Sequence, residues 1–410
     1  MKTFWRSIHL YLSLAAGLVI MVICFTGATL VFEKEFQQTI YPDRYYVMPA
    51  DHRLPLESVI NQFESRMAGT TVSGIKLYGD VARTLEVSYI DKDPSRAIAG
   101  TDGKVKSERG KRREGPRNKM AFINPYNGDL IGMHEGRSGF FSTMFSLHRW
   151  LLMGDIGKLL VGVSTTIFLF IIITGLVLWW PGTRDKLKQH LTYKWAGWKR
   201  INHDLHIVTG FYVAIFLFAF GFTGLAWSFK WFNDGIYLIT GTENKRPEPP
   251  VSVYRANAGS KSFDEIYSAI TKEVPGAEYY QISRPKDSLS AFVVTVMPGN
   301  AVHERASDQY FVDQYRGRII GTGLYRDRNL GQQVRSIFYP IHVGSIGGLP
   351  GRIIAFFSCI AGVTFPITGL IMWINRLTKK RKKLRRKQGV EKSVSDTGFV
   401  SRRKKSSLPV

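Results

Sequence analysis

The chain has 410 residues, a formal net charge of +24 and two cysteines. A positive charge of this size fits either a nucleic acid or an anionic membrane surface. Four charge-free runs of 23 to 26 residues, at 7–32, 159–183, 207–229 and 353–375, decide between them, because about 20 apolar helical residues span a bilayer. The sequence therefore predicts four spanning helices in contact with the lipid bilayer, and it does not support nucleic acid as a partner.

The predicted elements alternate between the membrane and one side of it. Spanning helices are expected over 1–32, 148–182, 203–230 and 342–376. Two outer modules are expected over 33–147 and 231–341, with a loop over 183–202 and a basic tail over 377–410. The start of the chain, the loop and the tail carry the short clusters of Lys and Arg, which mark the cytoplasmic side. We therefore expect an inner-membrane protein with both termini in the cytoplasm and both modules in the periplasm.

Each outer module has the pattern of an α+β fold. The stretches "LESVINQF" and "FDEIYSAI" place apolar residues at helical spacing, and Ser262 with Glu265 predicts a capping box. Strand-like runs follow, "VARTLEVSYI" in one module and "LSAFVVTVMP" in the other. Gly128 and Gly317 then suit turns between short strands that need a positive φ.

The second half of the chain repeats the first. "FTG" recurs at Phe25 and Phe222, and "ITGL" recurs near the ends of the second and fourth spanning runs. These matches predict a tandem parallel repeat, with its halves related by a pseudo-two-fold axis along the membrane normal. The basic segment 104–119 has no counterpart, and it reads as a solvated loop or as a docking site for an anionic ligand.

Four histidines follow the same repeat. His9 and His206 each lie 16 residues before the Phe of an "FTG", whereas His148 and His342 each lie 26 residues before the Thr of an "ITGL". Equivalent residues face each other across a two-fold axis, so an iron on the axis could take one imidazole from each half. We therefore expect His9 with His206 to hold one haem and His148 with His342 to hold another.

Other interpretations of these histidines remain open. Single histidines at helix ends often face lipid headgroups, and interfacial packing would explain them without a cofactor. Zinc fits poorly because its sites need three or four close ligands, whereas a haem macrocycle needs only two axial ones. Since CxxCH is absent, any haem would be b-type. Lys158 and Arg352, each ten residues after an outer histidine, suit either lipid headgroups or haem propionates.

The stretches "SLHRW", "TGLVLWW", "NPYNGDLIG" and "VDQYRGRIIG", in this order, resemble the PepSY-associated transmembrane family. Within the family the chain is similar to iron-regulated inner-membrane reductases that carry two haems b and reduce Fe(III)-siderophores in the periplasm. This resemblance implies His9 and His206 as ligands of the inner haem and His148 and His342 as ligands of the outer one. His203 is matched by Arg6 rather than by a histidine, and it could replace His206 on a rotated helix.

The resulting expectation is a membrane protein of four transmembrane helices and two PepSY-like modules that acts as a ferric-siderophore reductase. No GxGxxG or flavin signature is present, so the electron donor would be a cytoplasmic protein or a quinol. Two alternatives stay open. One is a PepSY binding or sensing protein without enzymatic activity, which would not need the histidine pairs. The other is a haem conduit that serves a different periplasmic reductase.

Overall fold

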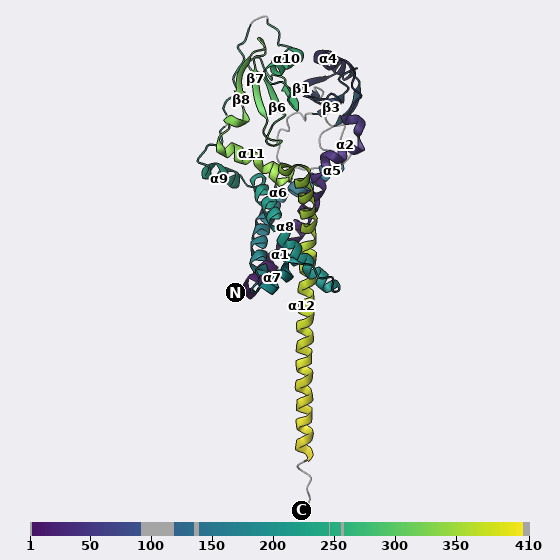
Figure 1. The fold of residues 1–410 in the computed structure, drawn as a ribbon, viewed down its shortest axis with the longest axis vertical. Coiled ribbons are helices and arrows are strands. Elements are labelled where there is room, and N and C mark those ends of the chain that lie inside the picture. Colours follow the sequence, from purple (N-terminus) through teal and green to yellow (C-terminus); the bar gives the residue numbers. More distant parts are fainter. Residues whose placement is uncertain (1, 92–118, 135–138, 246, 256–257, 405–410) are drawn as a thin grey trace, which may run out of the picture. The chain divides into compact units, whose positions relative to one another are not determined.

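The computed structural model describes residues 2–91, 119–134, 139–245, 247–255 and 258–404. Its helices are α1 (Lys2–Val31), α2 (Glu33–Ile40), α3 (Pro42–Tyr45), α4 (Leu56–Arg66), α5 (Phe140–Trp150), α6 (Gly154–Trp179), α7 (Arg184–Leu191), α8 (Trp198–Ser228), α9 (Lys230–Ile239), α10 (Phe263–Glu273), α11 (Leu330–His342) and α12 (Gly348–Lys404). Two short 3-10 helices, η1 (Tyr325–Asp327) and η2 (Ser345–Gly347), flank α11. The strands are β1 (Thr70–Tyr78), β2 (Leu85–Asp91), β3 (Lys119–Ile123), β4 (Leu130–His134), β5 (Tyr279–Ser283), β6 (Phe292–Met297), β7 (Asp308–Val312) and β8 (Ile319–Gly323) (Figure 1).

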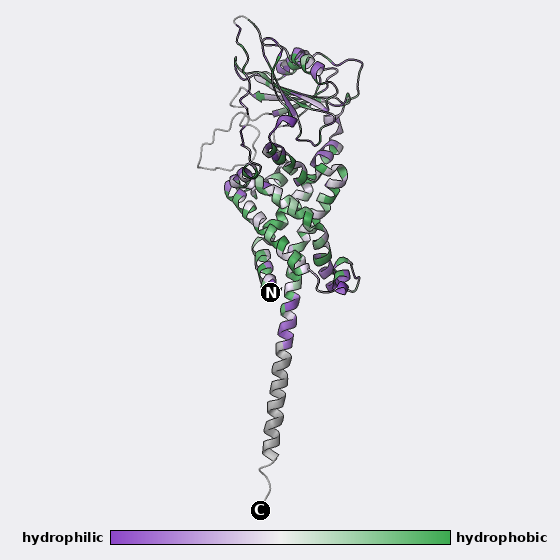
Figure 2. Ribbon diagram, turned by 60° about the vertical axis from the view of Figure 1, so that its left-hand side comes forward, coloured by the Kyte–Doolittle hydropathy of each residue, from purple (hydrophilic) through white to green (hydrophobic). Residues whose placement is uncertain are grey.

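Among these residues, four helical segments are long and apolar enough to cross a membrane: Lys2–Val31, Gly154–Trp179, Trp198–Ser228 and Ser345–Lys383. They appear mostly hydrophobic in Figure 2. The prediction of a multi-pass membrane protein is therefore confirmed. The last helix, α12, continues to Lys404 through the segment expected as a basic tail.

The chain divides into two compact units. Residues 1–25, 163–222 and 357–410 form a helical unit, and residues 26–162 and 223–356 form a unit that contains the sheet. In the sheet unit the positive φ predicted at the two turn glycines is confirmed, since φ is 77° at Gly128 and 66° at Gly317. The basic segment over 104–119 lies outside the described residues except for Lys119, where β3 begins.

The two outer segments, expected as separate modules, share one antiparallel sheet. Its strand order is β4-β3-β2-β1-β5-β6-β7-β8, so the halves join where β1 pairs with β5. Helices α4 and α10 pack on one face, where Ile60, Phe63, Ile266 and Ile270 share a core with buried residues of both halves. Each fully buried side chain of this size contributes about 1.5–3 kcal/mol, so the joint core makes the two halves one folding unit.

The first turns of α4 and α10 cap each other. The Asp264 carboxylate accepts hydrogen bonds from the backbone N–H groups of Leu56 (2.7 Å) and Glu57 (2.9 Å). In return, the Glu57 carboxylate accepts one from the backbone of Phe263 (3.3 Å). The expected capping box between Ser262 and Glu265 is also present. Each helix start thus depends on a carboxylate from the other half of the chain, which ties the halves together at the N-termini of both helices.

Candidate haem-ligating histidine pairs

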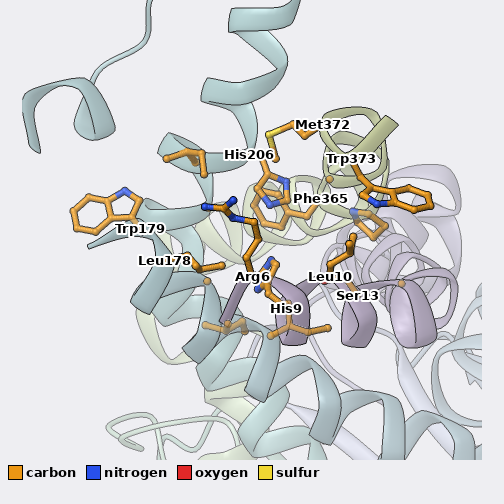
Figure 3. Close-up of a pocket in the computed structure, with 18 of the residues that line it drawn as sticks. Arg6, His9, Leu10, Ser13, Leu178, Trp179, His206, Phe365, Met372 and Trp373 are labelled. Carbon is orange, nitrogen blue, oxygen red and sulfur yellow. The ribbon is translucent and has the colours of Figure 1, made fainter. Parts of the chain in front are cut away.

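The helical unit brings His9 of α1 and His206 of α8 together. Their ring centroids lie 6.4 Å apart with an angle of 82° between the ring planes. Figure 3 shows both side chains projecting into the same space, with the Arg6 guanidinium beside them. Residues 197 positions apart in the sequence therefore meet in the way that the repeated offsets predict.

A threonine fixes the orientation of each of these rings. Nδ1 of His9 lies 2.9 Å from the Thr174 hydroxyl, and Nδ1 of His206 lies 2.8 Å from the Thr368 hydroxyl. Both hydroxyls already donate to carbonyls of their own helices, Thr174 to Ile171 at 3.0 Å and Thr368 to Thr364 at 3.0 Å. Because a hydroxyl has a single proton, a threonine that donates it to the carbonyl is left to accept the Nδ1–H of its histidine. Nε2 is then unprotonated, and its lone pair is available to a metal.

The glycine after each threonine makes room for the same ring. A Cβ at Gly175 would lie 3.3 Å from Cε1 of His9, and a Cβ at Gly369 would lie 3.3 Å from Cε1 of His206. These distances are shorter than ordinary van der Waals contacts between carbon atoms. Each Thr-Gly pair therefore holds its imidazole in two ways. The hydroxyl forms a hydrogen bond with Nδ1, and the absence of a side chain on the glycine lets the ring lie against the helix.

The outer pair has the same construction in the sheet unit. His148 of α5 and His342 of α11 have ring centroids 6.0 Å apart and ring planes at 66°. Nδ1 of His148 lies 3.2 Å from the Thr26 hydroxyl, and Nδ1 of His342 lies 3.2 Å from the Thr223 hydroxyl. A Cβ at Gly224 would lie 3.2 Å from Cε1 of His342. Both histidines lie on short helices that precede the spanning helices α6 and α12.

A cavity of about 370 Å³ adjoins the inner pair. This volume falls within the range of about 300–1,000 Å³ that is usual for small-molecule and cofactor pockets. The lining is mostly apolar and includes Gly175 and Gly369, and cationic groups are contributed by Lys2, Arg6 and Arg376. A largely apolar space with cations and two imidazoles suits an apolar, flat ligand that carries negative groups at one edge.

The spacing of both pairs would allow one metal to bind an imidazole nitrogen from each histidine. With metal–imidazole bonds of about 2 Å and each nitrogen about 1.1 Å from its ring centre, two opposed imidazoles have centres about 6 Å apart. The observed separations are 6.4 Å and 6.0 Å. No group of three or more His, Cys, Asp or Glu suited to a metal ion occurs within the described part of the chain. The donor sets therefore fit a cofactor that supplies its own equatorial ligands, such as haem.

The remaining predicted site residues have other neighbours. His203 lines the cavity, but its Nδ1 lies 3.1 Å from the carboxylate of Asp204, a buried residue that also accepts from Arg200. The Arg352 guanidinium contacts the carboxylate of Glu35 on α2, so it would have to exchange this partner to reach a haem propionate. Lys158 is half-buried in the first turns of α6.

The sequence analysis missed the four threonines. In the sequence, "FTG" and "ITGL" served only as markers of the repeat. The signal was present, because Thr26, Thr174, Thr223 and Thr368 each stand at a fixed offset from a histidine. Only the structure shows that these hydroxyls contact imidazoles.

In a comparison with protein families, the profile of the PepSY-associated TM region matches residues 6–376, a range that includes all four histidines and all four threonines. No curated protein matches the chain in sequence.

Proposed function

Because the chain belongs to the PepSY-associated transmembrane family, we propose that it is a two-haem electron-transfer protein that reduces Fe(III)-siderophores outside the bacterial inner membrane. One observation supports the cofactor above all others. Two histidine pairs have centroid separations near 6 Å, and each of the four imidazoles has Nδ1 within hydrogen-bond distance of a threonine.

In this proposal His9 and His206 hold an inner haem b, and His148 and His342 hold an outer one. Each bound haem supplies a site that accepts and gives up one electron. The protein keeps the imidazoles in one tautomer through the threonines, and a hydrogen bond to the second ring nitrogen raises the basicity of a ligating histidine. The mostly apolar lining of the inner cavity would limit the contact of a bound haem with water, which affects the reduction potential.

The direction of transfer follows from the proposed topology. The basic residues at the start of α1, between α6 and α8 and in α12 beyond residue 375 favour a cytoplasmic location for both termini. The two halves of the chain would then be parallel repeats, with the inner pair on the cytoplasmic side and the outer pair beside the periplasmic sheet. Electrons from a cytoplasmic protein or a quinol would enter at the inner pair and leave at the outer pair.

The substrate comes from the family resemblance, and its chemistry is consistent with release of iron. Siderophore oxygens are hard donors that favour Fe(III) and hold the softer Fe(II) less tightly. One electron therefore weakens the chelate without any acid, base or nucleophile from the protein. Neither a binding or sensing protein without enzymatic activity nor a sheet that only binds peptides would need the histidine pairs.

The test is the visible spectrum of the purified protein. Pyridine haemochrome analysis should give two b-type haems per chain after expression in haem-replete cells. A quadruple variant with all four histidines changed to alanine should be colourless, and a variant of the exposed His52, which belongs to neither pair, should keep both haems. A colourless wild-type protein would end the proposal.

A further inference from the structure

Helix α11 carries a cation and two rings on the face that includes the outer histidine. Arg335, Tyr339 and His342 stand at i, i+4 and i+7 and therefore share one side of the helix. The Trp227 ring lies 5.4 Å from the His342 ring, and the Arg335 guanidinium lies 4.6 Å over the same tryptophan. One aromatic ring thus connects the outer histidine to a positive charge.

Arg335 forms no ion pair with any carboxylate among the described residues. Its guanidinium donates a hydrogen bond to the neutral Asn233 side chain at 2.7 Å. Burial lowers the pKa of Arg335 from its usual value. A half-buried cation without an ion-pair partner costs free energy in a folded protein, so an anionic ligand beside Arg335 would stabilise it.

A second cation lies on the sheet. Ile75 and Leu77 of β1 are buried in the core beneath α4 and α10, so the intervening Lys76 faces the opposite side. Its ammonium lies 4.7 Å from the centroid of Tyr78 and 4.1 Å from that of Tyr279. Burial lowers the pKa of Lys76, whereas the carboxylates of Glu86 and Glu278 act to raise it. Glu86, the partner of Lys76 across the β1–β2 pair, also pairs with Arg83 and accepts from Tyr78, and no carboxylate forms an ion pair with Lys76 within the described ranges.

Arg305 links these two cations. Its guanidinium lies 4.1 Å over the ring of Tyr339 on α11, and it interacts electrostatically with both Tyr279 and Arg335. The adjacent Glu304 accepts a hydrogen bond from Ser345, and it forms no ion pair with any of these cations in the part of the chain that the structure describes. Three cations interleaved with aromatic rings therefore extend from the β1–β5 junction to the residue that contacts His342.

We propose that Lys76, Arg305 and Arg335 bind an anionic Fe(III) chelate with aromatic ligand groups, of the catecholate class, next to the outer histidine pair. The inference deepens the proposed function and rests on it. A tris-catecholate of Fe(III) carries net negative charge, which the three cations would neutralise, and its electron-rich rings suit contacts with cations. Ferric hydroxamates lack this charge and these rings. A haem held by His148 and His342 would supply the electron, so that its iron is oxidised from Fe(II) to Fe(III) as the iron of the chelate is reduced from Fe(III) to Fe(II), and no bond to the protein would form.

Gallium(III) complexes test binding separately from reduction, because Ga(III) keeps the shape and charge of the Fe(III) chelate but is not reduced under these conditions. Binding of a Ga(III) tris-catecholate to the detergent-solubilised protein would be followed by quenching of tryptophan fluorescence. We expect Arg335→Gln and Lys76→Gln each to weaken binding about tenfold, the loss of one charged contact. Arg326→Gln, at an exposed arginine already near Asp327, should bind as the wild type does. A Ga(III) trihydroxamate should bind at least about tenfold more weakly than the catecholate.

Three outcomes would overturn the inference. The first is equal binding of both gallium complexes, and the second is unchanged affinity in Arg335→Gln and Lys76→Gln. The third is a loss of haem from the outer pair in Arg335→Gln or Lys76→Gln together with normal binding of the gallium catecholate. The cation removed in that variant would then bind the haem carboxylates rather than the chelate. Melting temperature separates binding from a structural role, since removal of an unpaired cation should leave it unchanged or raised. A haem-free protein that still binds the gallium catecholate would refute the proposed function and leave this site standing.

Discussion

Replacement of Thr368 by valine tests whether the threonines hold the histidines for a metal. Valine keeps the shape of the buried threonine but removes the hydroxyl 2.8 Å from Nδ1 of His206. The imidazole then loses the acceptor that keeps the proton on Nδ1. We expect the protein to fold, because the hydroxyl's other bonds are to carbonyls of its own helix, and we expect weaker haem binding at the inner pair.

The magnitude follows from the hydrogen bond. An unsatisfied buried donor costs about 1–3 kcal/mol, and loss of the partner of a ligating histidine typically lowers metal affinity 10- to 100-fold. The inner haem should therefore dissociate about ten times faster or more in Thr368→Val. In Thr223→Val the effect at the outer pair should be smaller, since its hydrogen bond to His342 is longer, at 3.2 Å. Haem transfer to excess apomyoglobin, followed at the Soret band, measures both rates.

Thr364→Val is the matched control. Thr364 lies one turn before Thr368 on α12, and its hydroxyl donates to the carbonyl of Ala361 at 2.8 Å without a bond to a histidine. The substitution Thr364→Val replaces the same atoms in the same helix but leaves the hydrogen bond to His206 intact. The inner haem of this variant should therefore dissociate at the wild-type rate. If Thr364→Val and Thr368→Val lose haem equally fast, the effect comes from helix packing, and the role of the threonine in orienting the ligand is refuted.

Further expectations concern cofactor content, reactivity, topology and stability. His342→Ala should keep one haem of two, and chemically reduced His342→Ala should pass electrons to a ferric chelate far more slowly than wild type in stopped flow. His206→Ala should also keep one haem, but its dithionite-reduced form should still reduce the chelate in a single turnover, and equal rates in the two variants would contradict an outer terminal donor. A cysteine introduced within 104–119 should react with an impermeant maleimide from the periplasm, whereas labelling only from the cytoplasm would reverse the proposed topology. Asp264→Ala should lower the free energy of unfolding by about 1–2 kcal/mol, as for other lost helix caps, and an unchanged thermal transition would show that the cap contributes little.

Sequence reasoning succeeded where a pattern is long or repeated. The spanning helices follow from apolar runs that exceed the thickness of a bilayer, and the structure has helices of the required length at all four places. The family expectation is confirmed by the match over residues 6–376. His9 and His206 were paired by their equal offsets from "FTG", and their ring centroids lie 6.4 Å apart. Such features can be predicted because they depend on the residues of one segment or on a comparison of the two halves of the sequence.

The strand that joins the halves of the sheet was missed for a physical reason. Within β1 the register shifts between Val72 and Gly74, so the buried residues Val72 and Ile75 do not alternate regularly with exposed ones. A Cβ at Gly74 would lie 2.8 Å from the carbonyl oxygen of Ile282 in β5, which shows why glycine stands there. A glycine inside a strand marks close approach of another backbone, but sequence alone does not say which backbone approaches.

The threonine contacts and the histidine pairs connect different parts of the chain. Every contact stays within one half: His9 with Thr174 and His148 with Thr26 in the first, His206 with Thr368 and His342 with Thr223 in the second. Each half therefore orients its own imidazoles before they meet a partner, whereas every close imidazole pair joins the two halves. A metal held between such rings would bond to both halves at once. Its binding free energy should therefore stabilise the association of the halves, because a ligand that binds only the assembled state favours that state.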